Sequence, residues 1–243
     1  MAHYIEKTEK LTLPLVVLNG TVAFPAITVN FELSDKANIS AIEAANSVNS
    51  FIFIVSRKYI SNEPLDLSKV FNVGTVAKIK QSIKSPDGKL RVIAEGFARG
   101  IAEEYKDFAN YRIANVMCKT INITDHEDLK VEALTREAIA AVEKMSAFLP
   151  APSKEALGSM KTIKNPGSLA DFIASNILVR HTDKQEILSI FEPISRLERL
   201  IVLIEEETAL LECEKSIHKE VRARLNQNQK EYYLREQLRV IKE

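Results

Sequence analysis

The C-terminal stretch constrains the fold most, because it is composed almost entirely of strong helix formers. Between positions 193 and 243 there is no glycine, and the only proline is Pro193 at the start. A continuous helix over these residues would be about 75 Å long, at a rise of about 1.5 Å per residue. A rod of that length extends beyond a compact domain of this size. We therefore predict one long protruding helix over 193–243.

The apolar residues of this predicted helix form two groups. The first group recurs at steps of three and four residues, which is the pattern of a packed stripe: Leu197, Leu200, Ile201, Ile204, Leu211 and Ile217. Positions 222–231 contain Leu225 as their only large apolar residue, so this segment should bridge solvent or rest on a partner. A continuous coiled coil is the alternative, and the polar gap argues against its seam. Because no glycine or proline stop signal occurs near Glu243, we expect the chain to be the front part of a longer protein.

Composition and charge limit the classes of function. The chain has 243 residues, which suits one or two domains, and its 33 basic residues balance 33 acidic ones. A net charge of zero lacks the excess of positive charge that is typical of proteins that bind nucleic acid or an anionic membrane surface. No secretory signal and no apolar run of membrane-spanning length is present. Two distant cysteines, Cys118 and Cys213, indicate reduced thiols and a cytoplasmic protein.

The front half has the pattern of a small curled sheet or barrel. Short runs that are apolar or alternate in polarity, separated by turn residues, predict strands at 13–18, 28–33, 51–55, 74–83, 90–95 and 111–117. In the fourth of these, we expect Thr75, Ala77, Ile79 and Ile83 to share one face. Ser34 and Asp35 are N-cap candidates for a helix over 37–47.

The back half has the period of helices. We predict a helix that starts at 125–128 and ends at the prolines of 150–152, with one inward face: Leu129, Ala133, Ala140, Met145 and Phe148. A second helix should follow Asn165 and a third should cover 184–191, before Pro193 opens the rod. The predicted fold class is α+β, with a β-rich domain at 1–122, a helical bundle at 123–192 and the long helix at 193–243.

The sequence lacks the motifs of the common enzyme classes. It contains no phosphate-binding loop and no Gly-x-Ser-x-Gly turn. Its four histidines have no histidine or cysteine partner at the spacing of metal ligands: His3, His126, His181 and His218. We predict no catalytic, cofactor-binding or metal-binding residue in this chain.

Several segments, in this order along the chain, resemble one family. They are Leu-Pro-Leu-Val-Val-Leu at 13–18 with Phe-Pro at 24–25, and the segments 70–79, 86–88, 91–96, 165–174, 183–188, 196–197 and 229–238. On these residues the chain resembles the N-terminal region of the Lon family, the ATP-dependent bacterial protease also called endopeptidase La. It departs from the family pattern at Ala26, where glycine is usual, and around 30–38.

The resemblance implies a fold and a role. The front half would be a barrel of the PUA-like kind. The ATP- and Mg-binding module and the Ser–Lys catalytic pair of such a protease would lie beyond Glu243, so this chain would be non-catalytic. Its expected partners are unfolded or damaged proteins and further copies of itself in a six-membered ring, with no nucleic acid and no membrane. The full-length protein would be a serine protease that degrades misfolded and regulatory proteins.

The resemblance and the apolar residues together give two sets of candidate contacts. The loop at 22–27 is the candidate substrate contact, through Phe24, Pro25 and Ile27. The alternative for Phe24 and Ile27 is that they close the barrel end, as buried apolar residues usually do. The candidate contacts with a neighbouring copy or the ATPase module lie near the C-terminus: Tyr232, Tyr233, Leu234 and Leu238.

Two further interpretations stay open. The chain could be a purely structural spacer and oligomerisation element, with the barrel as a passive cap. Less favoured is an independent RNA- or ligand-binding barrel, in which Lys78, Lys80 and Lys84 would face the ligand and Phe97 would stack on a base.

Overall fold

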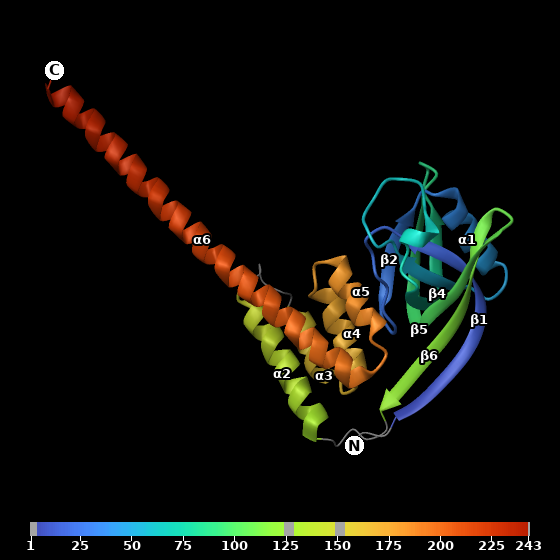
Figure 1. Ribbon diagram of the computed structural model, residues 1–243. Coiled ribbons are helices and arrows are strands. Elements are labelled where there is room, and N and C mark those ends of the chain that lie inside the picture. The colour runs from blue at the N-terminus through green and yellow to red at the C-terminus, as the bar shows by residue number, and fades with distance from the viewer. Residues whose placement is uncertain (1–3, 124–128, 149–153, 243) are drawn as a thin grey trace.

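The computed structural model describes residues 4–123, 129–148 and 154–242. Figure 1 shows a β-rich half, a group of helices beside it, and one long helix that extends far beyond both. This arrangement confirms the predicted α+β class and the protruding helix. Within the described ranges, no helix is both long and apolar enough to cross a membrane.

Six strands form the β-rich half. They are β1 (Tyr4–Leu18), β2 (Thr28–Leu33), β3 (Phe51–Ser56), β4 (Val73–Lys84), β5 (Leu90–Phe108) and β6 (Tyr111–Ile123). Their order is β2-β5-β4-β3-β1-β6, and β5 also pairs with β6, so the sheet closes on itself. Strand β5 pairs with β2 through its first part, up to Glu95, and with β6 from Arg99 onward. Among the described strands, β2 pairs with β5 alone, which leaves its other side as a sheet edge.

The helix α1 (Lys36–Asn46) packs on the barrel where the sequence predicts a helix. Asp35 is its N-cap and accepts a hydrogen bond from the Asn38 backbone. The Asn38 amide donates to the carbonyl of Val17 and accepts from its N–H, at 3.1 Å each, which fixes the helix to β1. The hairpin turn at 85–89 is also as predicted, with Gly88 at φ 82°.

One predicted strand face is partly wrong. Thr75, Ala77 and Ile79 are buried as expected, but Ile83 is 51% exposed. The register between β4 and β5 shifts between Ile79 and Gln81, and this irregularity changes which residues face the core beyond it.

A short 3₁₀ segment, η1 (Leu67–Lys69), lies in the loop between β3 and β4, and the helical half consists of five α-helices among the described residues. These helices are α2 (Leu129–Ser146), α3 (Lys154–Thr162), α4 (Pro166–Asn176), α5 (His181–Ser189) and α6 (Pro193–Lys242). Helix α3 was not predicted from the sequence, and α5 begins and ends earlier than the predicted 184–191. The helix start at 125–128 and the prolines at 150 and 152 lie outside the described residues.

The predicted inward face of α2 is wrong for most of its members. Leu129 is 80% exposed, and Ala133 and Ala140 are also exposed. The buried residues of α2 are Val131, Ala138, Val142 and Met145. They follow steps of three, four and seven residues and form the stripe that packs against α6.

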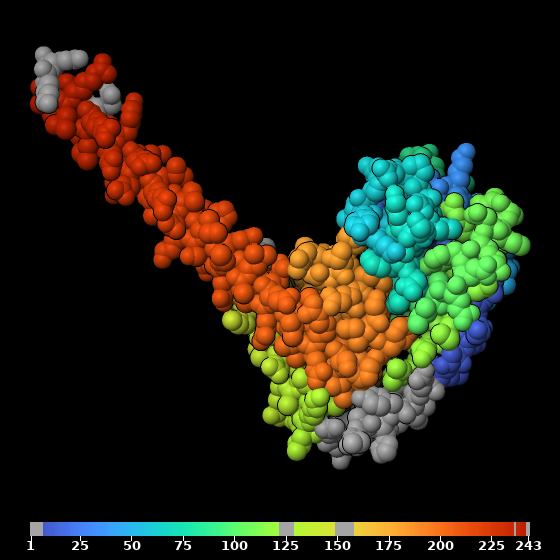
Figure 2. All heavy atoms as spheres, in the orientation of Figure 1, coloured from blue at the N-terminus to red at the C-terminus, as the bar shows by residue number. Residues whose placement is uncertain are grey.

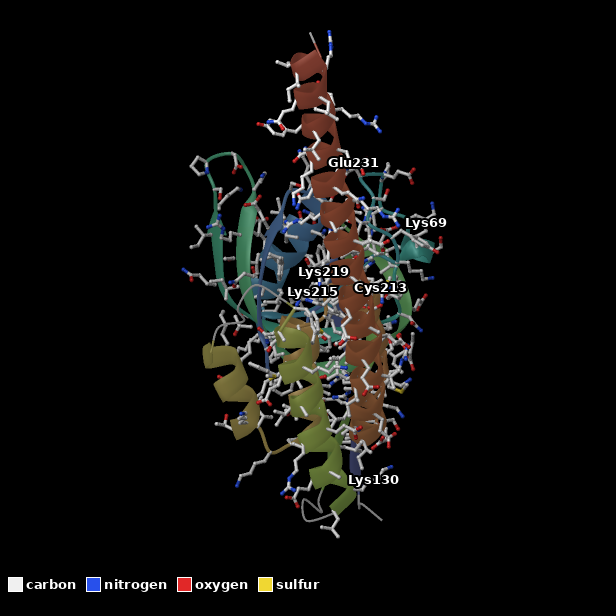
Figure 3. The ribbon with its side chains drawn as sticks, turned by 90° about the vertical axis from the view of Figure 1, so that its left-hand side faces the viewer. Lys69, Lys130, Cys213, Lys215, Lys219 and Glu231 are labelled. Carbon is white, nitrogen blue, oxygen red and sulfur yellow. The ribbon has the colours of Figure 1, made fainter. Side chains whose placement is uncertain are left out.

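The long helix α6 has two different halves. Its first part contributes Leu197, Leu200 and Ile204 to a core, whereas every residue with a described side chain from position 212 onward is exposed. Ile217 is among the exposed residues, so the packed stripe is shorter than predicted. Figure 2 shows this second part as a rod that projects away from the rest of the chain. In Figure 3 it carries Lys215, Lys219 and Glu231.

The barrel and the helices share a core. Val22, Phe24 and Val73 of the β-rich half belong to one buried cluster together with residues of α2, α4, α5 and α6. The predicted boundary between the β-rich domain and the helical bundle therefore does not separate two independent cores. The domain boundaries at 122 and 192 stay predictions.

Candidate functional site

The loop at 22–27 joins β1 to β2 and lies where the barrel packs against the helices. Phe24 is 1% exposed and packs into the shared core. Its ring is therefore closed to a substrate in this structure, and its placement supports the alternative that it seals the barrel end. Ile27 is half-buried against the same cluster, and Pro25 is half-buried. Of the three predicted contacts, Pro25 lines a surface cavity.

Hydrogen bonds hold this loop closely against β5. The Ala26 N–H donates to the Gly96 carbonyl at 2.9 Å, and the Gly96 N–H donates to the Ile27 carbonyl at 3.0 Å. A Cβ at position 96 would lie 2.0 Å from the Phe24 carbonyl oxygen, so only glycine permits this approach. The buried Thr75 hydroxyl donates to the Ala23 carbonyl at 2.7 Å. The loop is consequently a fixed part of the barrel surface.

Ala26, at which the chain departs from the family pattern, has an unusual backbone conformation. Its φ is 57°, in the left-handed region that favours glycine. The exposed alanine keeps the loop conformation despite its Cβ. An alanine in this region is strained, because its Cβ lies close to the following carbonyl oxygen.

A β-bulge exposes an aromatic ring beside this loop. In β5, Gly96 pairs with Ala77 and Ala98 pairs with Val76, so Phe97 is the extra residue. Bulges redirect side chains in this way, and Phe97 is 71% exposed. Its ring makes an edge contact with Phe51, with centroids 5.8 Å apart. We call Pro25, Phe51 and Phe97 the seam patch, because Phe97 lies where β5 changes partner from β2 to β6.

A cavity of about 210 Å³ lies next to the seam patch. Pro25 and Phe97 line it from the barrel side, and Asn165 and Ser168 at the start of α4 line it from the helical side. Four charged side chains from different elements are also in its wall: Arg99 of β5, Lys119 of β6, Asp171 of α4 and Arg196 of α6. The cavity is thus a junction of the barrel with two helices.

Three of these residues, Arg99, Asp171 and Arg196, form a buried network. Arg99 donates to both carboxylate oxygens of Asp171, at 2.9 Å from Nη1 and in a shorter contact from Nη2, and its Nε donates to the Leu188 carbonyl at 3.0 Å. Arg196 Nη1 lies 3.2 Å from each of the same oxygens. All three side chains are at least nine-tenths buried. Burial, followed by the nearby charge of Arg99, lowers the pKa of Arg196 to about 10.

The cluster predicted near the C-terminus lies on the exposed part of α6. Tyr232, Tyr233, Leu234 and Leu238 are all more than half exposed. The Gln237 amide donates to the Tyr233 hydroxyl at 3.1 Å along the helix. These side chains are available to a neighbouring protein, and the contact itself stays a prediction.

The described residues contain no group of three or more His, Cys, Asp or Glu side chains that could hold a metal ion. Both cysteines are free thiols, with Cys118 buried and Cys213 exposed. Burial, together with the charge of Glu9, raises the pKa of the Cys118 thiol to about 11. Such a thiol is a poor nucleophile at neutral pH.

Comparison with known proteins places the chain in a family. Residues 12–206 match the family described as the ATP-dependent protease La (LON) substrate-binding domain. The chain is 34% identical over 236 residues to the Lon protease of Brevibacillus choshinensis, which covers 97% of this chain and 30% of that protein. Lon protease 1 of Bacillus subtilis is 32% identical over 232 residues, with 96% and 30% covered.

A solved structure confirms the fold. The N-terminal domain of Mycobacterium avium complex Lon protease superposes with a TM-score of 0.60 at 20% identity, covering 80% of this chain and 98% of that one. The chain spans about 30% of the length of the curated relatives that it matches. These findings confirm the resemblance seen in the sequence. The chain belongs to the family of ATP-dependent protease La (Lon) substrate-binding domains.

Proposed function

We propose that this chain is the substrate-engaging N-terminal region of a cytoplasmic, ATP-dependent serine protease that degrades misfolded and regulatory proteins. The match of residues 12–206 to the substrate-binding domain family carries the proposal. In this proposal, catalysis and cofactor binding belong to other parts of the protease. ATP and Mg²⁺ act in other modules of such a protease.

The seam patch supplies the surface that this role requires. Unfolded proteins expose apolar side chains without a fixed sequence, so their receptor needs exposed apolar groups on a rigid frame. Phe97 is exposed, Phe51 supports it from the side, and hydrogen bonds fix the neighbouring loop to β5. Pro25 remains in the proposed contact, whereas Phe24 becomes its buried support.

Strand β2 offers a second means of contact. Its pairing with β5 ends at Thr28, opposite Glu95, two residues before Phe97. Its other side is a sheet edge within the described structure. An extended substrate segment could pair with this edge through main-chain hydrogen bonds while a side chain rests on the seam patch. This combination tolerates many sequences, as a quality-control protease requires.

The exposed part of α6 supports an assembly role that is compatible with substrate binding. Apolar and aromatic side chains continue along it to Ile241 without a described packing partner on the same chain. We propose that Tyr232, Tyr233, Leu234 and Leu238 contact a neighbouring copy or the ATPase module in a homohexamer. A purely structural spacer would use the same residues but would not bind unfolded protein.

Binding of unfolded casein separates these two functions. Fluorescein-labelled, chemically unfolded casein is titrated with the chain and followed by anisotropy, with a natively folded protein as control. We expect saturable binding that weakens at least about tenfold in Phe97→Ser, since removing a buried aromatic contact costs on the order of 2 kcal/mol at an interface. Phe108→Ser, which alters another exposed phenylalanine at the end of β5, should bind as the parent does.

The outcomes discriminate between the proposals. No binding by the parent chain would refute substrate engagement by this region and leave the spacer function. Equal weakening by Phe97→Ser and Phe108→Ser would refute the seam patch as the site. Circular dichroism of each variant verifies that the fold is retained.

A further inference from the structure

The cavity beside the seam patch carries more positive than negative charge. One carboxylate, that of Asp171, lies between the guanidinium groups of Arg99 and Arg196. The Glu192 carboxylate is also near Arg196 and partly offsets the lowering of the Arg196 pKa, but it accepts hydrogen bonds from the Ile194 and Ser195 backbone at the start of α6. Among the described residues, Asp171 is the only acidic residue in the cavity wall.

The two arginines retain donors that the fold does not use. A guanidinium group has one N–H on Nε and two on each terminal nitrogen. Arg99 donates once from each of its nitrogens, which leaves one N–H on Nη1 and one on Nη2 without an acceptor among the described residues. Arg196 Nη2 donates once, to the Phe191 carbonyl. Buried donors of this kind are satisfied by water or by a ligand.

The size of the cavity restricts the ligand. A volume of about 210 Å³ exceeds the 150 Å³ or so that accommodates benzene in an engineered protein cavity. It is smaller than the roughly 300–1,000 Å³ of sites for drug-sized molecules. The cavity can therefore hold the end of one amino-acid residue but not a nucleotide. Each unused N–H of a guanidinium group can donate one charge-assisted hydrogen bond to a carboxylate oxygen.

We propose that this cavity binds a carboxylate group of the protein substrate, while the adjacent apolar side chain of that substrate rests on Phe97. Pro25 and Phe97 line the cavity together with Arg99, so one extended chain reaches both groups. The site would select segments in which a carboxylate follows an apolar residue, including the C-terminal end of a chain. This inference rests on the proposed function, which it makes more specific.

Three peptides test the proposal. Each has the sequence Gly-Ser-Gly-Leu-Phe-Leu with fluorescein at the amino end; the first ends in a free carboxylate, the second in an amide, and the third adds a glutamate before the amide. We expect the free acid to bind at least about tenfold more tightly than the amide, as one charge-assisted pair contributes in a desolvated site. The glutamate peptide shows whether a side-chain carboxylate serves as well as the chain end.

Ser168 provides the matched variants. It is the third residue of α4, exposed at the cavity wall, and its N–H is capped by Asn165 at 2.9 Å. Glutamate is favoured at this position of a helix, so Ser168→Glu keeps the fold while adding a negative charge beside the cavity. Ser168→Gln adds the same bulk without the charge. We expect the ratio of the amide's dissociation constant to that of the free acid to fall to about one in Ser168→Glu and to stay above about threefold in Ser168→Gln.

The outcomes distinguish failure of the carboxylate site from failure of the proposed function. Equal binding of acid and amide peptides by the parent would overturn the carboxylate site and leave the seam patch intact. Binding of unfolded casein with no binding of any peptide would also overturn the carboxylate site alone. Failure of both casein and peptides to bind would overturn the proposed function as well. Equal loss of the preference in Ser168→Glu and Ser168→Gln would overturn recognition of the ligand by charge, because the added bulk alone would then explain the loss.

Discussion

Replacement of Asp171 by asparagine tests how strongly the buried ion pairs of Asp171 with Arg99 and Arg196 hold the barrel against the helices. The substitution keeps the shape of the side chain but removes the negative charge that both Arg99 and Arg196 contact. Because all three side chains are at least nine-tenths buried, solvent screens the remaining positive charges weakly. Removal of one partner from a buried ion pair costs about 3–5 kcal/mol. A folded domain is stable by about 5–15 kcal/mol, so this loss is about a fifth of the total or more.

Urea unfolding followed by circular dichroism measures this loss. With a denaturant slope of about 3 kcal/mol per molar, the midpoint should fall by about 1–2 M. The matched control is Glu103→Gln, which breaks the exposed ion pair of Lys10 and Glu103 at 3.0 Å. Exposed pairs contribute about 0–1 kcal/mol, so this variant should unfold close to the parent. Equal midpoints for Asp171→Asn and Glu103→Gln would refute the view that the buried network holds the two halves together.

Three further predictions concern the loop and the thiols. Ala26→Gly should stabilise the chain by about 0.5–1 kcal/mol in the same urea assay, since relief of the left-handed strain exceeds the entropy that glycine adds to the unfolded state; a lower midpoint would contradict the strain. Gly96→Ala should destabilise by about 1–3 kcal/mol, because its Cβ would meet the Phe24 carbonyl oxygen at 2.0 Å. Cys213 should react with Ellman's reagent in the native protein, whereas Cys118 should react only on unfolding. The pKa of the Cys118 thiol is about 11 in the native protein against 9.0 for an ordinary thiol, so its thiolate is about 100-fold rarer at pH 8. Because the folded state holds this proton more tightly than the unfolded state does, the free energy of unfolding should fall as pH rises from 9 toward 11.

Features set by local chemistry were predictable from the sequence. Pro193 begins α6, and Asp35 and Asn165 cap α1 and α4, because capping depends on residues that are neighbours in the chain. The hairpin turn at Gly88 depends on local preference in the same way. The burial of the first part of α6 follows from its leucine and isoleucine spacing.

Features set by pairing across the chain were not predictable. The second part of β5 contains Glu103 and Glu104 side by side and gives no regular alternation, although β6 pairs with most of it across a register shift between Ala102 and Glu104. The exposure of Phe97 depends on a bulge that exists only in the register with β4. In α2 the alanines are compatible with either face, and packing against α6 selects the face of Ala138.

The cavity wall is the clearest case of such a long-range feature. Arg99 and Asp171 are 72 residues apart in the chain and come from a strand and a helix. No spacing rule connects such positions, and a buried charge is uncommon enough that composition gives no signal either. The sequence therefore gives no signal that Arg99 and Asp171 meet, whereas the neighbouring loop is recognisable from its phenylalanine and proline.

Site-specific photocrosslinking at position 97 is the most direct test of the account. Benzoylphenylalanine replaces Phe97 in one variant and Phe108 in the other, and each is irradiated with unfolded casein and with a folded control protein. We predict a crosslink to unfolded casein from position 97 only, suppressed by excess unlabelled unfolded protein. Crosslinks of equal yield from both positions, or from neither, would contradict the assignment of the seam patch as the substrate contact.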